Sequence, residues 1–295
     1  MMYQDNNIIK ATIFGISSAM AASIMALFVK LAAAHTTNSA IILSRFSISF
    51  IYILLILSTQ KLRKKSIPIK SAHPFMHILR SVTGVLSMLL FYYALAYIPL
   101  VDGSLLVMTN TLFIPILAAI FLQQKTTVKN WLFIILGFIG VALIIKPGHE
   151  LFNPASLLAL AAGLSGAISI LSIRELSKYD NPQTIMLYYF AIACLISGGV
   201  SIFNWQTPSL HTLIILLGVG IFGTIYQEFL IRASFYASAK IVSSLLYLLV
   251  VFSGLFDWLI WHHIPDLFSW LGIILVCLGS ILVIVCATTE TKSHP

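Results

Sequence analysis

Residues 8–33 read IIKATIFGISSAMAASIMALFVKLAA, an apolar run interrupted by only two charged side chains, Lys10 and Lys30. A helix needs about 20 mostly apolar residues to cross roughly 30 Å of hydrocarbon. The run is far longer than the core of a secretory signal peptide, and no clear small-residue cleavage site follows it. We therefore expect a retained transmembrane helix here.

The rest of the chain repeats this pattern. Of its 295 residues 59% are hydrophobic and only 9% are charged, whereas a soluble domain is about a quarter charged. Clusters of Pro, Asn, Lys or His divide the chain into ten apolar runs: 8–33, 38–58, 74–97, 100–122, 130–145, 154–174, 182–203, 211–235, 241–261 and 267–287. The pattern predicts an all-α integral membrane protein with ten transmembrane helices and short connections.

Lysine and arginine gather in alternate connections. If the N-terminus lies inside, the inner connections receive most of these residues, including a basic segment from Lys61 to Lys70. The outer side receives only Lys146, with Lys30 near an outer helix end. The positive-inside rule then places both termini in the cytoplasm. The net charge of +8 indicates contact with anionic lipid head groups rather than nucleic acid.

The chain contains an internal repeat. A shift of 139 positions aligns the third to fifth runs with the eighth to tenth, and a shift of 148 aligns the first run with the sixth. The identities at the first shift are Gly84/Gly223, Ala94/Ala233, Tyr97/Tyr236, Ser104/Ser243, Trp131/Trp270 and Gly140/Gly279; those at the second are Gly15/Gly163, Ser17/Ser165, Ala19/Ala167 and Lys30/Lys178. Because each half, 1–147 and 148–295, has an odd number of helices, we expect two inverted five-helix repeats with a site between them near the midplane.

The sequence offers no pattern typical of a cofactor or a metal. Its three cysteines, Cys194, Cys277 and Cys286, lie inside apolar runs without the paired spacing of a zinc site. Residues 218–223 spell GxGxxG, but no strand precedes them, so close helix packing is the better interpretation. The chain also lacks a P-loop, which argues against ATP-driven pumping.

Several motifs resemble the drug/metabolite transporter superfamily of the EamA type over nearly the whole chain. They are Arg45-Phe46, His77-Ile78-Leu79-Arg80, 91–95 (FYYAL), 115–122, Trp131, Gly137 with Gly140, 247–260 and Pro265-Asp266. Residues 77–80 and 247–266 are most similar to the branch of bacterial S-adenosylmethionine uptake carriers. The resemblance implies a carrier for a small organic solute such as an amino acid or a nucleoside-like metabolite. Gln124 and His263 stand where family members commonly carry Glu, so the roles of those acids do not transfer.

An ionisable side chain within a membrane span usually faces the bundle interior or a water-filled cavity. Glu228 and Arg232 lie four residues apart, hence on one helix face, and a stripe of Gly220, Thr224 and Gln227 continues that face toward the membrane centre. Two interpretations stay open: Glu228 lines the substrate path and attracts a cation or a proton, or it forms an internal ion pair with Arg232.

Two further arginines lie in predicted spans. Arg80, about two turns into the third run, precedes small residues on its face, and its planar fork suits bidentate binding of a carboxylate or phosphate; snorkelling to lipid head groups is the alternative. For Arg45 we expect a structural ion pair, with Asp102 or Asp257 as its partner near the outer helix ends.

Other polar and aromatic candidates for the site lie near the middle or the ends of their runs. Asn110 and Tyr247 are plausible hydrogen-bonding groups at the midplane, and aromatic walls are expected from Tyr92, Tyr93, Tyr226 and Trp258. Ordinary packing or an interfacial belt is the alternative for each aromatic residue.

We therefore predict a secondary transporter that works by alternating access, as a monomer or homodimer, on a small-molecule substrate. An integral-membrane enzyme acting on lipid-linked substrates would need a cluster of acids, histidines or cysteines at one membrane face, and the sequence offers only scattered ones. A membrane subunit that does not transport is the third possibility.

Overall fold

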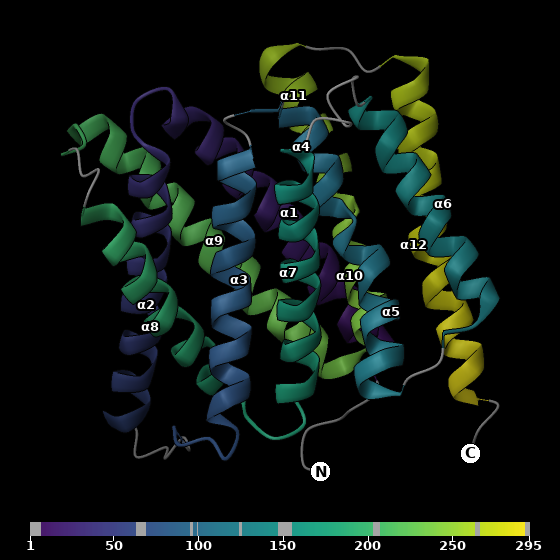
Figure 1. Ribbon diagram of the computed structural model, residues 1–295, viewed down its shortest axis with the longest axis horizontal. Helices are drawn as coiled ribbons and strands as arrows, with labels where there is room; N and C mark the ends of the chain where they lie inside the picture. The colour runs from purple at the N-terminus through teal and green to yellow at the C-terminus, as the bar shows by residue number, and fades with distance from the viewer. Residues whose placement is uncertain are drawn as a thin grey trace.

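The structure is a computed structural model that describes residues 7–62, 69–94, 97–98, 100–123, 126–146, 155–202, 207–262 and 266–292. Within these ranges the backbone forms twelve helices (Figure 1). They are α1 (Ile8–Ala33), α2 (Asn38–Leu62), α3 (Pro74–Ala94), α4 (Leu100–Met108), α5 (Asn110–Leu122), α6 (Val128–Ile145), α7 (Ser156–Leu176), α8 (Pro182–Ser201), α9 (Leu210–Tyr236), α10 (Ala239–Leu246), α11 (Leu248–Trp261) and α12 (Leu267–Lys292).

Ten stretches of the described chain are long and apolar enough to cross a membrane, which confirms the predicted number of spans. The fourth and ninth spans differ from the prediction, because each consists of two helices joined end to end, α4 to α5 and α10 to α11. At the first junction the Thr109 hydroxyl donates to the carbonyl of Leu106. At the second, the amide of Tyr247 bonds to the carbonyl of Ser244, three residues back, at 3.3 Å. Both junctions are thus tightened turns that interrupt the regular helical ladder.

Side chains at the helix starts satisfy amides that the helix itself leaves unpaired. The side chains of Asn7, Thr127, Asn181 and Ser209 each accept a hydrogen bond from the amide three residues later. These polar residues fall at the edges of the apolar runs, so the sequence marks these boundaries to within a few residues.

The two halves of the bundle run in opposite directions. α1 rises from the face where α12 ends, which we call the termini face, whereas its repeat equivalent α7 descends toward that face (Figure 1). α6 and α12, the last spans of the two halves, lie side by side and antiparallel (Figure 1). The inverted arrangement predicted from the odd number of spans is therefore the one observed.

Helix packing has the same symmetry. α1 packs along α9, and the equivalent pair, α7 and α3, pack along each other. The pairs α2 with α8 and α6 with α12 each join a helix to its own repeat equivalent. All these major contacts join one half to the other, so the two repeats interlock rather than fold as separate domains.

Glycines bring α6 and α12 into close contact. A Cβ atom at Gly140 would lie 2.7 Å from the carbonyl oxygen of Gly272, and one at Gly279 would lie 2.8 Å from the amide nitrogen of Gly137. Small residues let helix backbones approach in a membrane, where the hydrophobic effect does not drive helices together. Gly140 and Gly279 are equivalent in the repeat, so a glycine at the same repeat position allows close approach from each of the two helices.

An ion pair joins the same two helices on the face opposite the termini face. The Lys146 ammonium, just after α6, lies 2.6 Å from Asp266, just before α12. The hydrogen bond from Lys146 and those from Ser269 lower the pKa of Asp266 to about 2. The carboxylate is therefore ionised at neutral pH, as an ion pair with Lys146 requires.

The glycine contact predicts an asymmetric response to added methyl groups. Gly140→Ala should lower the Tm of the purified protein, because overpacking against backbone costs about 1–3 kcal/mol. The matched control is Gly198→Ala in α8, where a Cβ would meet no atom within 4 Å; it should leave the Tm unchanged or raise it, since Ala favours helix over Gly. Equal effects of the two substitutions on thermal unfolding in detergent would contradict this account of the contact.

Candidate functional site

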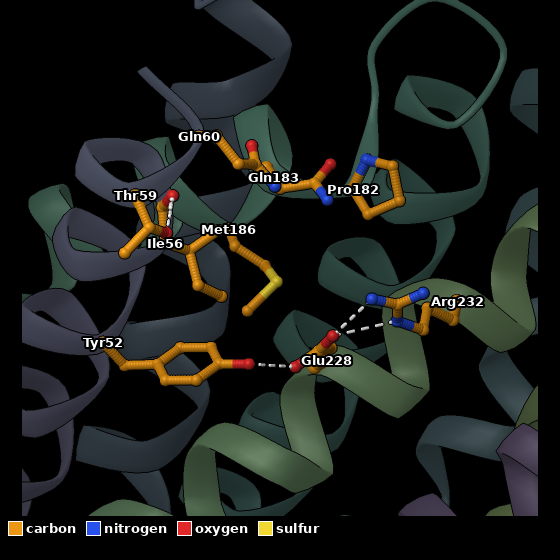
Figure 2. Close-up of a pocket in the computed structure, with 9 residues that line it drawn as sticks. All are labelled: Tyr52, Ile56, Thr59, Gln60, Pro182, Gln183, Met186, Glu228 and Arg232. Atoms are coloured by element: carbon orange, nitrogen blue, oxygen red, sulfur yellow. Dashed lines mark hydrogen bonds and ion pairs between the residues drawn. The ribbon is translucent and has the colours of Figure 1, made fainter. Parts of the chain in front are cut away.

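A cavity of about 350 Å³ opens between α2, α8 and α9 (Figure 2). Its wall is formed by Tyr52, Ile56, Thr59 and Gln60 of α2, Pro182, Gln183 and Met186 of α8, and Glu228 and Arg232 of α9. α2 ends and α8 begins at the termini face, so the cavity lies in the half of the bundle nearest that face (Figure 1). α2 belongs to the first repeat and the other two helices to the second.

Glu228 is the charged centre of this cavity. Arg232 donates to its Oε1 atom from Nε at 3.0 Å and from Nη2 at 2.5 Å, and the Tyr52 hydroxyl donates to Oε2 at 2.7 Å (Figure 2). The structure thus contains the internal ion pair that the sequence left as one of two interpretations. The same carboxylate also lines the cavity, and the other interpretation, that Glu228 attracts a cation or a proton there, stays a prediction.

The rest of the predicted α9 stripe does not reach the cavity. Thr224 forms a 2.6 Å hydrogen bond with Ser49 of α2, and a Cβ at Gly220 would lie 2.3 Å from Ile48. Gln227 is 2% exposed, and its Nε2 atom has no hydrogen-bond partner among the described residues. These residues lie in the packed contact between α2 and α9, on the side of the cavity away from the termini face.

A second group of buried polar side chains lies deeper in the bundle. The Arg80 guanidinium of α3 lies 3.8 Å from the centre of the Tyr189 ring of α8, and its Nη1 atom donates to the hydroxyl of Ser169 in α7 at 2.6 Å. Arg45 of α2 lies 5.9 Å from the centre of the Tyr226 ring of α9. We call Arg45, Arg80, Tyr189 and Tyr226 the arginine–tyrosine cluster.

Helix geometry places this cluster directly beyond the cavity. Tyr189 follows Met186 by one turn of α8, and Arg45 precedes Tyr52 by two turns of α2, about 10 Å along the axis. Since Met186 and Tyr52 form part of the cavity wall, the cluster lies one to two helical turns farther from the termini face than the cavity does.

Two glycines make room for the two arginines. A Cβ at Gly84 would lie 2.6 Å from Nη1 of Arg80, and a Cβ at Gly223 would lie 3.1 Å from Nε of Arg45. Gly84 and Gly223 are the first pair of the 139-position repeat. The two arginines are not repeat equivalents, because Arg80 lies on the same helix as Gly84, whereas Arg45 lies on α2 and faces Gly223 of α9.

The remaining predicted residues take other places. Asn110 is half-buried at the α4–α5 junction, where it accepts a hydrogen bond from Thr111 at 3.0 Å. Tyr247 is buried at the α10–α11 junction with its ring over Gly137. Trp258 is 36% exposed and contacts Trp270 of α12, away from the cavity and the cluster.

Three predicted side chains, those of Tyr92, Asp102 and Asp257, lie outside the described residues. Among the carboxylates that the structure describes, none lies within ion-pair distance of Arg45; its Nη1 atom instead contacts the Met88 sulfur at 3.0 Å. The predicted structural pairing of Arg45 therefore stays a prediction.

Sequence analysis missed Tyr52, Ser169 and Tyr189. All three lie inside apolar runs, where a tyrosine or a serine is normally interpreted as packing. Only the three-dimensional approach of α2, α7 and α8 to the charged residues of α3 and α9 gives them a role.

A third polar group joins the two halves at the termini face. Asp180, in the α7–α8 connection, accepts a hydrogen bond from Ser71 at 2.6 Å and lies 2.9 Å from Nε2 of His77 in α3. The His77 ring stacks on Tyr188 with ring centres 4.3 Å apart. We call this group the Asp180 clamp, because it holds the start of α3 to the second repeat.

Ten spans in two inverted halves, with buried polar groups of both halves facing each other, define the class of membrane carriers built on inverted repeats. Residues 9–146 and 153–285 each match the EamA-like transporter family. The chain belongs to this family, which confirms the resemblance seen in the sequence.

Curated relatives agree with this assignment. The riboflavin transporter of Vibrio cholerae serotype O1 is 28% identical and aligns with 82% of this chain and 81% of its own. The pseudopaline exporter CntI of Pseudomonas aeruginosa is 28% identical over 92% of both chains. The S-adenosylmethionine uptake transporter of Rickettsia bellii is 26% identical over 73% of this chain and 74% of its own.

A crystal structure of another protein has the same fold. It superposes with a TM-score of 0.80 at 16% sequence identity and covers 94% of this chain and 98% of the other. That likeness shows the architecture, and the family match carries the functional assignment.

The hydrogen bonds that Tyr52 and Arg232 donate to Glu228 should stabilise the fold. Tyr52→Phe removes one hydroxyl that donates to a carboxylate and should lower the free energy of unfolding by about 1–3 kcal/mol. Tyr179→Phe is the control, because that tyrosine is exposed.

A double-mutant cycle between Glu228→Gln and Arg232→Gln should give a coupling free energy of about 0.5 kcal/mol, as for other i,i+4 pairs. Additive effects in denaturant unfolding of the purified protein would argue against the pair.

Proposed function

We propose that this protein is a secondary transporter that moves a small organic metabolite across the bacterial cytoplasmic membrane by alternating access. The observation that carries the proposal is the convergence of buried polar groups from both repeats. Arg45, Tyr52 and Arg80 come from the first, and they face Tyr189, Tyr226 and Glu228 of the second. Sites in inverted-repeat carriers lie between the repeats near the midplane.

In this proposal residues 1–147 and 148–295 are the two repeats that move relative to each other, and the movement rearranges the contacts by which they interlock. The two family matches, 9–146 and 153–285, support the division. The cavity beside Glu228 is the path from the termini face, and Arg80, Tyr226 and Glu228 contact the solute. Arg232 holds the Glu228 carboxylate in place.

The termini face is cytoplasmic in our proposal. The basic segment between α2 and α3, Lys129 at the start of α6 and Lys240 at the start of α10 support this orientation by the positive-inside rule. The chain acts without a cofactor and changes its solute only in position, as a carrier does and an enzyme does not.

S-adenosylmethionine is the first solute to test, because residues 77–80 and 247–266 are similar to the uptake carriers of that metabolite. Riboflavin and pseudopaline, for which two other relatives are named, are the next. The family assignment supports solutes of this size and polarity.

Counterflow in proteoliposomes tests the transport proposal. Vesicles preloaded with unlabelled S-adenosylmethionine should take up the labelled compound to a transient excess over equilibrium, and protein-free vesicles should not. Riboflavin is run in parallel. If the label is recovered in a chemically changed form, the protein is an enzyme; if no solute of the panel gives counterflow, the transport proposal fails.

The orientation is tested with single cysteines. In a variant whose Cys194, Cys277 and Cys286 are replaced by Ala, a cysteine at Gln60 should react with an impermeant maleimide only from the cytoplasmic side. A cysteine at Thr207 should react only from the outside. The reverse pattern in intact cells and inverted vesicles would place the termini outside.

A further inference from the structure

The arginine–tyrosine cluster holds two buried positive charges with only weak acceptors around them. Arg45 is 7% exposed and Arg80 is 2% exposed. The Nε atom of Arg80 has no hydrogen-bond partner among the described residues, and Nη1 meets a neutral serine hydroxyl. Arg45 meets a thioether sulfur, which is a poor acceptor.

A buried guanidinium cannot escape its desolvation cost by losing its proton, because arginine stays protonated in proteins. Such a charge persists when an acid or another set of strong acceptors offsets the cost. Ring faces supply part of this compensation: Tyr189 lies under Arg80, while Phe46 and Tyr226 flank Arg45. No described group supplies a negative charge.

The carboxylates that the structure describes are already engaged elsewhere. Glu228 binds Arg232 and Tyr52, Asp180 binds Ser71 and His77, Glu175 binds Lys178, and Asp266 binds Lys146. Each of these acids has its own cation or hydrogen-bond donor. The negative charge that would complete the cluster is therefore to be sought in the solute.

We propose that Arg45 and Arg80, with the hydroxyls of Tyr189 and Tyr226, bind an oxyanion group of the transported solute, a carboxylate or a phosphate. This inference rests on the proposed transport function and assigns the chemical class of the solute. It also changes the role of Arg45 from structural to solute-binding.

The geometry fits such a group. The Tyr189 ring, which lies under Arg80, packs against the Phe46 ring with centres 5.6 Å apart, and the Arg45 guanidinium lies over that same Phe46 ring. The guanidinium fork presents parallel N–H groups that match the two oxygens of a carboxylate or phosphate. Arg45 and Arg80 come from the first repeat, and the two tyrosines come from the second. A bound anion would thus contact both repeats.

Matched solute pairs test the inference. We expect S-adenosylmethionine to compete for transport about tenfold or more better than its decarboxylated form, and riboflavin 5′-phosphate better than riboflavin. About tenfold is the loss expected for one missing charge-assisted pair. The first pair reports a carboxylate and the second a phosphate. Equal competition within both pairs overturns the inference while transport itself stands.

The arginine variants supply the second arm. Arg45→Gln and Arg80→Gln should remove the discrimination within the pair that the wild type shows, whereas Arg174→Gln, whose arginine binds the Ser234 carbonyl outside the cluster, should retain it. If Arg45→Gln and Arg80→Gln still discriminate, the inference is wrong. The inference is also wrong if Asp102→Asn or Asp257→Asn abolishes discrimination as Arg45→Gln does, because Arg45 would then have a protein partner.

A binding measurement makes the test independent of transport. Pyruvate and phosphate, compared with chloride at equal ionic strength, should raise the Tm of the purified wild-type protein and not that of Arg80→Gln. Gly84→Ala should weaken this shift, because its methyl group would displace the Arg80 guanidinium. No anion-specific shift in the wild type overturns the inference; a Tm shift without counterflow would leave the anion site standing and remove the transport proposal.

Discussion

An odd number of membrane crossings in each half is the constraint on which the rest of this structure depends. Two similar halves of five spans each, joined in one chain, must enter the bilayer in opposite directions. Their equivalent helices then pack in symmetric pairs, α1 with α9 and α7 with α3, and α6 against α12. Because every one of these contacts crosses from one half to the other, the main helix packing of the molecule lies between the repeats.

Polar groups on that surface are held by neighbours from the opposite repeat. Glu228 of α9 depends on Tyr52 of α2, and Arg80 of α3 depends on Ser169 of α7. The Asp180 clamp follows the same rule at the termini face. A movement of one repeat relative to the other must break or rearrange such contacts. The polar interior therefore couples the relative position of the two repeats to the solute that occupies the site.

Much of the fold is predictable from the sequence, because a span reveals itself through its own composition. The ten runs, the caps at Asn181 and Ser209, and the pairing of Gly84 with Gly223 need only one-dimensional information. The partners of a buried charge need the third dimension. Glu228 and Arg232 were identified as a pair from their spacing on one helix, but Tyr52 lies on another helix and carries no local signal. The breaks at Thr109 and Tyr247 escaped prediction for a similar reason, since a tightened turn barely changes the hydropathy of a long apolar run.

Those two breaks give the bundle a mechanical property. α4 and α11 both lie in the half of the bundle away from the termini face, and each is joined to the rest of its span through a single turn (Figure 1). A helix bends at the least cost where its hydrogen-bond ladder is already interrupted. α4 and α11 can each tilt about their joint while α5 and α10 keep their packing. The fourth and ninth spans are thus jointed rather than rigid, and the face opposite the termini face can change shape without disturbing the helix packing near the termini face.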